Sequence, residues 1–116
     1  MLVGAVFTSP NLAPGSEGPY YVIFDVDIQD VPRYLTYMDK VRPALEAAGG
    51  RYLVRGGAYK VYEGAWEPDR LVLIEFPSQD AWETFYYGPD YAGIKQIRDE
   101  TSTGNMVGVE GLATRP

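Results

Sequence analysis

Residues 20–29, YYVIFDVDIQ, alternate between two kinds of side chain, and this alternation constrains the fold more than any other feature of the chain. The even-numbered residues 22 to 28 are all apolar. The odd-numbered residues 21 to 27 mix tyrosine and isoleucine with two aspartates. Because successive side chains of a strand point to opposite faces, the segment predicts a strand with one apolar face and one mixed face.

A helix pattern follows this strand. Asp30 stands at the N-cap position, and Pro32 is tolerated in the first turn, where the N–H groups have no partner inside the helix. Apolar residues then recur every three or four positions as far as Gly49–Gly50, where glycine easily adopts the left-handed conformation that ends a helix. Residues 51–57 predict the second strand, with a bulge or bend at its glycine pair and with residues 58–64 extending it.

The second half of the chain repeats this order. Residues 70–76, RLVLIEF, are apolar on both faces and predict a strand that is covered on each side. We expect Ser78 to cap a helix that residues 88–91, GPDY, interrupt, and Thr103–Gly104 to end its second piece. Residues 105–111, NMVGVEG, are then the last strand.

This order predicts an α+β, ferredoxin-like fold, β-α-β-β-α-β, in which two helices cover one face of a four-stranded antiparallel sheet with strand order 4-1-3-2. At 116 residues the chain has room for one such domain. We expect the domain to span residues 20–112, with residues 1–19 as an N-terminal arm or loop and residues 113–116 as a C-terminal tail. Residues 1–8 are expected either to add a short strand or to be disordered.

The composition excludes several kinds of function. The chain has no cysteine and no histidine, which removes disulfides, thiolate nucleophiles, ordinary zinc sites and Ser-His-Asp or Cys-His catalysis. Its formal charge is -6 and it has no basic run, so we expect no nucleic-acid partner. No apolar run approaches the roughly 20 residues that span a bilayer, and no basic residue precedes Arg33. We therefore expect a cytoplasmic protein without a metal, a cofactor or a membrane partner.

The sheet face without helices is the candidate site. Side-chain parity assigns to it a set of residues that is half apolar and half ionisable: Tyr21, Ile23, Asp25, Asp27, Arg51, Leu53, Arg55, Leu71, Leu73, Glu75, Met106, Gly108 and Glu110. Left in water, the apolar members would form a large exposed patch. We therefore expect a symmetric homodimer, packed sheet against sheet.

Antiparallel pairing should gather four of these side chains at one end of the sheet: Arg51, Tyr21, Glu75 and Glu110. Arg55 belongs toward the other end. A direct cross-strand pair such as Arg51 and Glu75 has Cβ atoms ~5 Å apart and can bond. Two carboxylates held close in a partly dry site would raise one pKa and supply an acid or base near neutral pH. The alternative is a network of ion pairs that satisfies itself and sets the register of the dimer.

Several stretches resemble a bacterial family of small proteins, domain-of-unknown-function family thirteen-thirty, over about residues 20–112: GGRYLVRGG, EGAWEPDRLVLIEFPS, GPDY and the closing VEG. The resemblance implies a dimeric α/β barrel but no established reaction. It also implies that seven residues occupy family-motif positions: Arg51, Arg55, Glu63, Arg70, Glu75, Tyr91 and Glu110. The chain departs from the family in its longer segment before Tyr20 and in Gly88, where serine is commoner.

Three functions remain open at this point. The first is a cofactor-free enzyme, similar to a monooxygenase or isomerase by fold analogy, acting on a small organic molecule. Its expected residues are Glu75, Glu110 and Tyr91 for catalysis and Arg51, Arg55, Tyr21 and Asp25 for substrate binding. The second is a non-catalytic binder of a small ligand or a stress-related sensor. The third is a structural dimer with self-paired charges, in which Tyr91 packs in the core.

Overall fold

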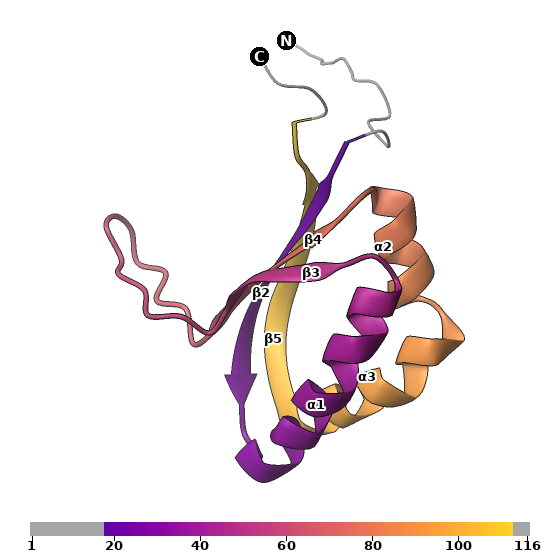
Figure 1. Cartoon of the computed structure of the whole chain (residues 1–116). Helices are drawn as coiled ribbons and strands as arrows, with labels where there is room; N and C mark the ends of the chain where they lie inside the picture. Colours follow the sequence, from indigo (N-terminus) through magenta and orange to yellow (C-terminus); the bar gives the residue numbers. More distant parts are fainter. Residues whose placement is uncertain (1–17, 113–116) are drawn as a thin grey trace, which may run out of the picture.

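The computed structural model describes residues 18–112, and Figure 1 shows them as a four-stranded antiparallel sheet with helices on one face. The elements follow in the order β2 (Tyr20–Ile28), α1 (Val31–Ala47), β3 (Arg51–Arg55), β4 (Leu71–Phe76), α2 (Gln79–Tyr86), α3 (Pro89–Thr101) and β5 (Ser102–Glu110). The strand order β3-β4-β2-β5 is the predicted order read from the opposite edge, so the ferredoxin-like prediction is confirmed. The predicted N-terminal segment, residues 1–19, and C-terminal tail, residues 113–116, lie outside the described residues except for Gly18 and Pro19.

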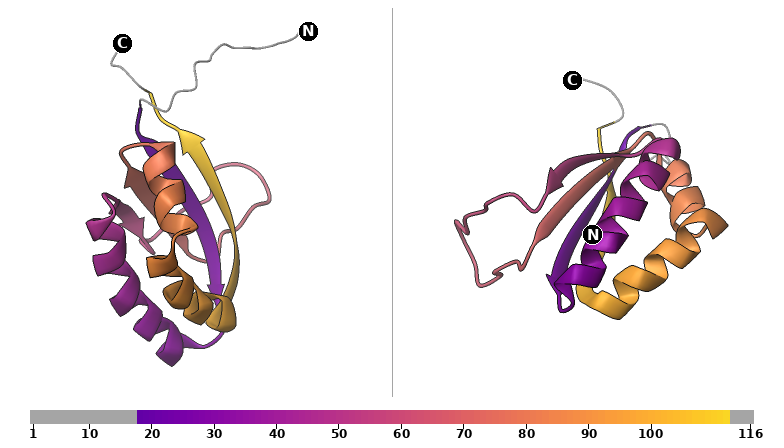
Figure 2. Two further views of the ribbon diagram at one scale, coloured as in Figure 1. Left: turned by 90° about the vertical axis from the view of Figure 1, so that its right-hand side faces the viewer. Right: turned by 60° about the horizontal axis from the view of Figure 1, so that its bottom comes forward.

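All three helices lie on the same side of the sheet (Figure 2). The interrupted second helix is two separate helices, α2 and α3, joined at Tyr87–Gly88. None of the helices within residues 18–112 is long and apolar enough to cross a membrane.

The core lies between the helices and the face of β2 that the alternation predicts. Val22 and Val26 are fully buried, and Phe24 is almost so. They pack with the apolar stripe of α1, which includes Val41 and Leu45. Complete burial of one such side chain contributes about 1.5–3 kcal/mol. Burial of this face therefore stabilises the fold.

The ends of α1 form as predicted. The Asp30 carboxylate accepts a hydrogen bond from the backbone N–H of Arg33 at 3.2 Å. At the other end Gly49 has φ of 100°, and the Gly50 N–H donates to the Leu45 carbonyl at 2.9 Å. A left-handed glycine thus turns the chain from α1 into β3.

Residues 58–64 do not extend β3, so that prediction is wrong. Gly56 has φ of 77° and turns the chain out of the sheet, while its N–H closes the turn on the Leu71 carbonyl at 2.7 Å. Residues 56–70, which we call the arm, form a loop that projects away from the sheet and the helices (Figure 1). Beyond the glycine, no strand within residues 18–112 pairs with the backbone.

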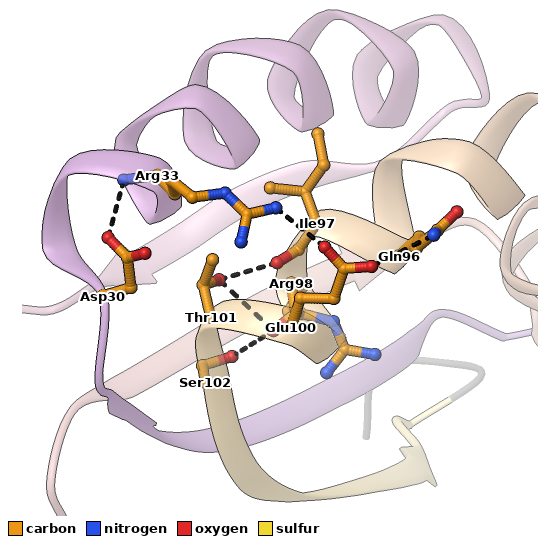
Figure 3. A network of polar contacts seen from close by, with 8 residues as sticks. All are labelled: Asp30, Arg33, Gln96, Ile97, Arg98, Glu100, Thr101 and Ser102. Atoms are coloured by element: carbon orange, nitrogen blue, oxygen red, sulfur yellow. Dashed lines mark hydrogen bonds and ion pairs between the residues drawn. The ribbon is translucent and has the colours of Figure 1, made fainter.

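The junction of α3 and β5 also differs from the prediction, because α3 passes directly into the strand without a glycine stop. The Thr101 hydroxyl donates to the Ile97 carbonyl at 2.7 Å, and the Ser102 hydroxyl donates to the Arg98 carbonyl at 2.7 Å. Figure 3 shows these bonds beside the ion pair of Arg33 with Glu100, which joins the start of α1 to the end of α3. Side-chain hydroxyls thus cap the last carbonyls of α3 by donating hydrogen bonds to them. Thr103 and Gly104, which were expected to end the helix, belong to β5.

The register of β5 is the reverse of the predicted parity. Met106 lies opposite Phe24, Gly108 opposite Val22, and Glu110 opposite Tyr20. Residues directly opposite in an antiparallel pair share a face, so Met106, Gly108 and Glu110 lie on the helix side. Gly108 leaves the space that the Tyr20 ring occupies, whereas Val107 and Val109 lie on the face without helices.

Gly50 and Gly57 have contrasting surroundings, so substituting each of them tests the packing at the start of β3. A Cβ added at Gly50 would lie 2.5 Å from Phe76 Cε1 and 2.8 Å from Leu45 Cδ2, whereas one at Gly57 meets nothing within 4 Å. We predict that Gly50→Ala lowers the free energy of unfolding by about 1–3 kcal/mol through overpacking. Gly57→Ala should change it by less than about 0.5 kcal/mol. Urea unfolding of both variants measures the difference, and equal midpoints would contradict it.

Candidate functional site

Three of the predicted site residues meet on the sheet face without helices, which we call the open face. Glu75 lies directly opposite both Arg51 and Tyr21. Arg51 Nε donates to Glu75 Oε1 at 2.6 Å, and the Tyr21 hydroxyl donates to Glu75 Oε2 at 3.0 Å. A shallow groove of about 270 Å³ borders this cluster. The predicted gathering of these three side chains is confirmed.

The cluster holds Glu75 in its charged form. The hydrogen bond from Arg51, together with that from Tyr21, lowers the pKa of Glu75 below its usual value, although partial burial acts in the opposite direction. The expectation of a raised carboxylate pKa is therefore wrong for Glu75. Both carboxylate oxygens are already bonded, and the Arg51 side chain is 69% exposed. This is the geometry of a self-satisfied cross-strand pair near solvent.

Asp25 also lies on the open face, and its carboxylate fastens the base of the arm. Its Oδ2 accepts from Trp66 Nε1 at 3.0 Å. Its Oδ1 accepts from the backbone N–H groups of Asp69 at 2.8 Å and Arg70 at 3.3 Å. Both oxygens therefore have donors from within the chain.

Glu110 does not join the cluster on the open face. It lies opposite Tyr20 on the helix side of the sheet. Burial raises the pKa of Tyr20, and the negative charges of Glu83 and Glu110 raise it further. The contribution of Glu110 agrees with its position near the Tyr20 phenol. Because Glu75 and Glu110 lie on opposite faces of the sheet, the predicted pair of carboxylates does not form.

A bulge moves Arg55 to the helix side as well. The pairing of β3 with β4 shifts between Tyr52 and Val54, and after the shift Arg55 lies opposite the core residue Val72. One extra residue in a strand reverses the faces of all that follow. The Arg55 guanidinium lies 4.3 Å from the centre of the Tyr52 ring, and its Nη2 donates to the Met38 carbonyl at 3.0 Å. The predicted place of Arg55 on the open face is therefore wrong.

Arg55 and Tyr91 instead line a pocket between the sheet and the helices, which we call the helix-side pocket. Its wall is formed by Phe24, Tyr34, Tyr37, Met38, Val41, Leu45, Tyr52, Arg55, Arg70, Val72, Ile74, Trp82, Phe85, Tyr91 and Met106. The cavity measures about 20 Å³, which is room for a single water molecule. The wall combines two arginines and four tyrosines with apolar residues, and none of its described residues is a carboxylate.

Three tyrosines of this wall, Tyr34, Tyr37 and Tyr52, are neutral phenols near pH 7. Burial strongly raises the pKa of Tyr37 and also raises that of Tyr34. Burial raises the pKa of Tyr52 to about 12, against the opposing effect of the Arg55 charge. The hydroxyls of Tyr37 and Tyr91 lie 3.0 Å apart and share one hydrogen bond. The wall can therefore donate hydrogen bonds, but it does not offer a phenolate base.

A third arginine lies beside the pocket. Arg98 of α3 is buried, and its guanidinium lies 4.9 Å from the centre of the Phe24 ring. Its nearest carboxylate oxygen is Asp99 Oδ1 at 3.7 Å, and within the described residues its Nε has no hydrogen-bond partner. This buried charge adds to the positive potential on the helix side of the sheet.

Sequence reasoning missed most of this pocket. Tyr34 and Tyr37 belong to the apolar residues that recur every three or four positions in the first helix, and both are buried there, but this spacing does not distinguish a pocket wall from a filled core. The sequence pointed to Arg70 as a site residue only through the family resemblance, in which Arg70 occupies a motif position. Nothing in the sequence indicated the bulge before Arg55. The sequence predicted an irregularity at the glycine pair that follows Arg55, whereas the register shifts between Tyr52 and Val54.

Comparison with known proteins gives a family and a fold. The profile of a family described as a domain of unknown function, DUF1330, matches residues 19–112. A protein of unknown function from Rhodopseudomonas palustris has a similar structure, with a TM-score of 0.69 and 19% identity over 86% of this chain and 85% of that one. SnoaB, a cofactor-independent oxygenase from Streptomyces nogalater, has a TM-score of 0.53 and 11% identity over 84% and 95% of the two chains. A search of functionally curated proteins finds no match.

The open-face cluster predicts a specific pH dependence. We expect Arg51→Gln to raise the pKa of Glu75 toward the ordinary value of about 4.3, because the largest cause of its low pKa is removed. A lowered folded-state pKa stabilises the fold above the ordinary pKa, and this stabilisation is lost as the pH falls through the folded value. The stability difference between wild type and variant should therefore shrink below about pH 4.

Carboxyl ¹³C chemical shifts measured against pH provide the direct readout. Arg33→Gln is the matched control, since Arg33 lowers the pKa of Glu100 in the same way at the α1–α3 junction. Each substitution should move the pKa of its own partner alone. A Glu75 titration that is identical in wild type and Arg51→Gln would contradict the assignment.

Proposed function

The chain belongs to the DUF1330 family, whose function is unknown, and we propose that it binds a small organic anion with a flat apolar body in the helix-side pocket. One observation carries the proposal. The charged side chains that line the pocket are Arg55 and Arg70, with no carboxylate among its described lining residues to neutralise them.

The bonding of the two arginines favours an anion. Arg55 donates to the neutral carbonyl of Met38, and Arg70 Nη2 donates to the carbonyl of Arg55 at 3.4 Å. Neither forms an ion pair with a carboxylate of the described residues, so their positive charge is uncompensated at short range. A guanidinium presents several donors in one plane and matches the two oxygens of a carboxylate or an enolate.

The rest of the wall favours a flat, apolar ligand body. Phe24, Trp82 and Phe85 contribute aromatic surface, and planar rings stack well on such residues and on guanidinium groups. The hydroxyls of Tyr37 and Tyr91 add hydrogen-bond donors.

Binding requires the pocket to widen, since the cavity holds only about 20 Å³. Met38 and Met106 line it and are only partly buried, as are both arginines. These long, unbranched side chains change rotamer at little cost and can make room for a ligand. The proposal therefore expects a ligand to displace these side chains and leave the buried aromatic wall in place.

The pocket favours binding over acid–base catalysis. Its described lining includes no Asp, Glu, Lys or His, and the raised pKa values of Tyr34, Tyr37 and Tyr52 leave those phenols protonated. A general base near neutral pH is thus missing from the wall. Of the residues expected from sequence, Arg55 and Tyr91 enter the proposed site, whereas Glu75 and Glu110 do not.

Paired probes test the proposal. We expect 2-naphthoate to raise the melting temperature and the isosteric neutral amide, 2-naphthamide, to have little effect. Arg55→Gln or Arg70→Gln should weaken naphthoate binding about tenfold or more, as expected for the loss of a charged hydrogen bond of about 1.5–3 kcal/mol. Arg51→Gln, on the other face of the sheet, is the matched control and should bind as the wild type does. Equal binding of acid and amide, or no binding at all, would count against the pocket.

We also propose that two copies of the chain associate through the open face. Val107 and Val109 of β5 are 57% and 49% exposed on this face, next to the half-exposed side chains of Ile23, Leu71 and Leu73. An apolar surface of this extent on a small domain is typical of an interface. The resemblance to a family of dimeric barrels supports the same arrangement.

Sedimentation of matched variants tests the dimer. The wild type should sediment at twice the chain mass of 12.9 kDa. Val107→Glu should shift it to the monomer, because a carboxylate would be buried in the interface without a partner. Leu35→Glu places the same charge on the outer surface of α1, where Leu35 is 52% exposed, and should leave the dimer intact. A monomeric wild type at micromolar concentration would refute the proposed dimer.

A further inference from the structure

Arg70 lies at the junction of the arm with β4, and its backbone is bonded to β2 on both sides. Its carbonyl accepts from the Val26 N–H at 3.0 Å, and its N–H donates to the Asp25 carboxylate at 3.3 Å. The N–H of Asp69, one residue earlier, donates to the same carboxylate oxygen at 2.8 Å. Two successive N–H groups of the arm therefore converge on Asp25.

The Arg70 side chain lies on the opposite face of the sheet from the carboxylate that holds its backbone. Leu71 pairs directly with Asp25, and both side chains lie on the open face. Because side chains alternate along an extended chain, the residue before Leu71 points to the helix side. Arg70 accordingly lines the helix-side pocket. Asp25 thus holds the backbone of a pocket residue from outside the pocket.

The guanidinium of Arg70 also has defined neighbours. Its Nη2 donates to the Arg55 carbonyl at 3.4 Å, and a Cβ added at Gly56 would lie 2.6 Å from its Nε. Gly56 has φ of 77°, a conformation that suits glycine. Burial raises the pKa of Tyr34, and the positive charge of Arg70 is the largest effect that opposes this rise. The Arg70 charge therefore acts on the phenols of the pocket wall.

The placement of a guanidinium decides how well it binds an anion. Its N–H groups lie in one plane, and a carboxylate bonds two of them only when the two groups are aligned. A long side chain that is ordered only on binding loses rotamer freedom at that step, so a position fixed beforehand improves affinity. Arg70 ends a projecting loop (Figure 1), and the Asp25 bonds tie the N–H side of its backbone to the sheet.

The contacts of Asp25 favour such an indirect role over direct contact with a ligand. Its Oδ1 accepts from the two backbone N–H groups, and its Oδ2 accepts from Trp66 Nε1 at 3.0 Å. A carboxylate placed in the pocket would also repel the anion proposed to bind there. On the far face of the sheet, the carboxylate can hold Arg70 without competing for its guanidinium.

We propose that Asp25 is a positioning residue for anion binding, which holds the backbone of Asp69 and Arg70 so that the Arg70 guanidinium is in place before the ligand arrives. This role rests on the proposed function, because it concerns how the same pocket recognises its anion. The expected sign of its effect is distinctive. Removal of a negative charge by itself favours an anion, whereas loss of the Asp25 carboxylate should weaken anion binding.

Fluorescence titration with 2-naphthoate tests the role in a cycle of variants. We expect Asp25→Ala to weaken naphthoate binding about threefold or more in the wild-type background and to have no effect in Arg70→Gln protein. Glu75→Ala is the matched control, since it removes another bonded carboxylate of the open face, and it should bind naphthoate at least as well as the wild type. Trp66→Phe removes the third donor of Asp25 alone and should leave the affinity unchanged.

Two further substitutions separate the geometry of Asp25 from its contribution to folding. Asp25→Asn keeps one oxygen that can accept from both backbone N–H groups, so it should recover most of the wild-type affinity. Asp25→Thr suits a strand, but its hydroxyl ends one bond short of the carboxylate oxygens. It should bind naphthoate as weakly as Asp25→Ala does, and it takes the place of that variant if alanine prevents folding. Melting temperatures show which variants are folded.

The possible outcomes separate the positioning role from the proposed function. Equal losses of affinity in the wild-type and Arg70→Gln backgrounds would mean that Asp25 stabilises the pocket in general, and would overturn the positioning role. Unchanged or tighter binding by Asp25→Ala, or an Asp25→Asn protein as weak as Asp25→Ala, overturns it too. Each of these results leaves the proposed function intact. Wild-type protein that binds no naphthoate, or Arg70→Gln protein that binds it as the wild type does, refutes both.

Discussion

The structure depends on a simple constraint, which is that a four-stranded sheet has two faces and three helices cover only one of them. The alternation of β2 decides which face is covered, because Val22, Phe24 and Val26 form the apolar side. Every other strand must then place its apolar residues in line with these. The open face, the direction of the arm and the position of the pocket all follow from this division.

The two faces of the sheet also carry different charged side chains. Glu75 and Asp25 lie on the open face, where donors within the chain satisfy them. Arg55 and Arg70 lie in the wall of the helix-side pocket, beside phenols such as that of Tyr37, which burial keeps neutral. A group of cations held in a partly buried wall without carboxylates is costly unless an anion or a polar network compensates it. That imbalance, more than the likeness to an oxygenase fold, is the reason to expect an anionic ligand.

Local patterns predicted the elements well because their causes are local. The cap at Asp30 and the left-handed turn at Gly49 require only the residues around them. The meeting of Arg51 with Glu75 and Tyr21 also followed from parity and antiparallel pairing, since Arg51 pairs with Glu75 before the register of β3 shifts, and Tyr21 pairs with Glu75 in a regular stretch of β2 and β4. The roles proposed for these side chains in binding remain predictions.

The amino-acid sequence by itself determined the ferredoxin-like order of elements, the covered face of β2 and the exclusion of cysteine and histidine chemistry, because each depends on residue type and short spacing. Only the tertiary structure decided the faces on which Arg55 and Glu110 lie. A bulge in β3 and the direct passage of α3 into β5 set those registers, and strand register is fixed by pairing with distant segments. A shift of one residue exchanges the two faces of a strand, so the candidate site moved from the open face to the pocket beneath the helices.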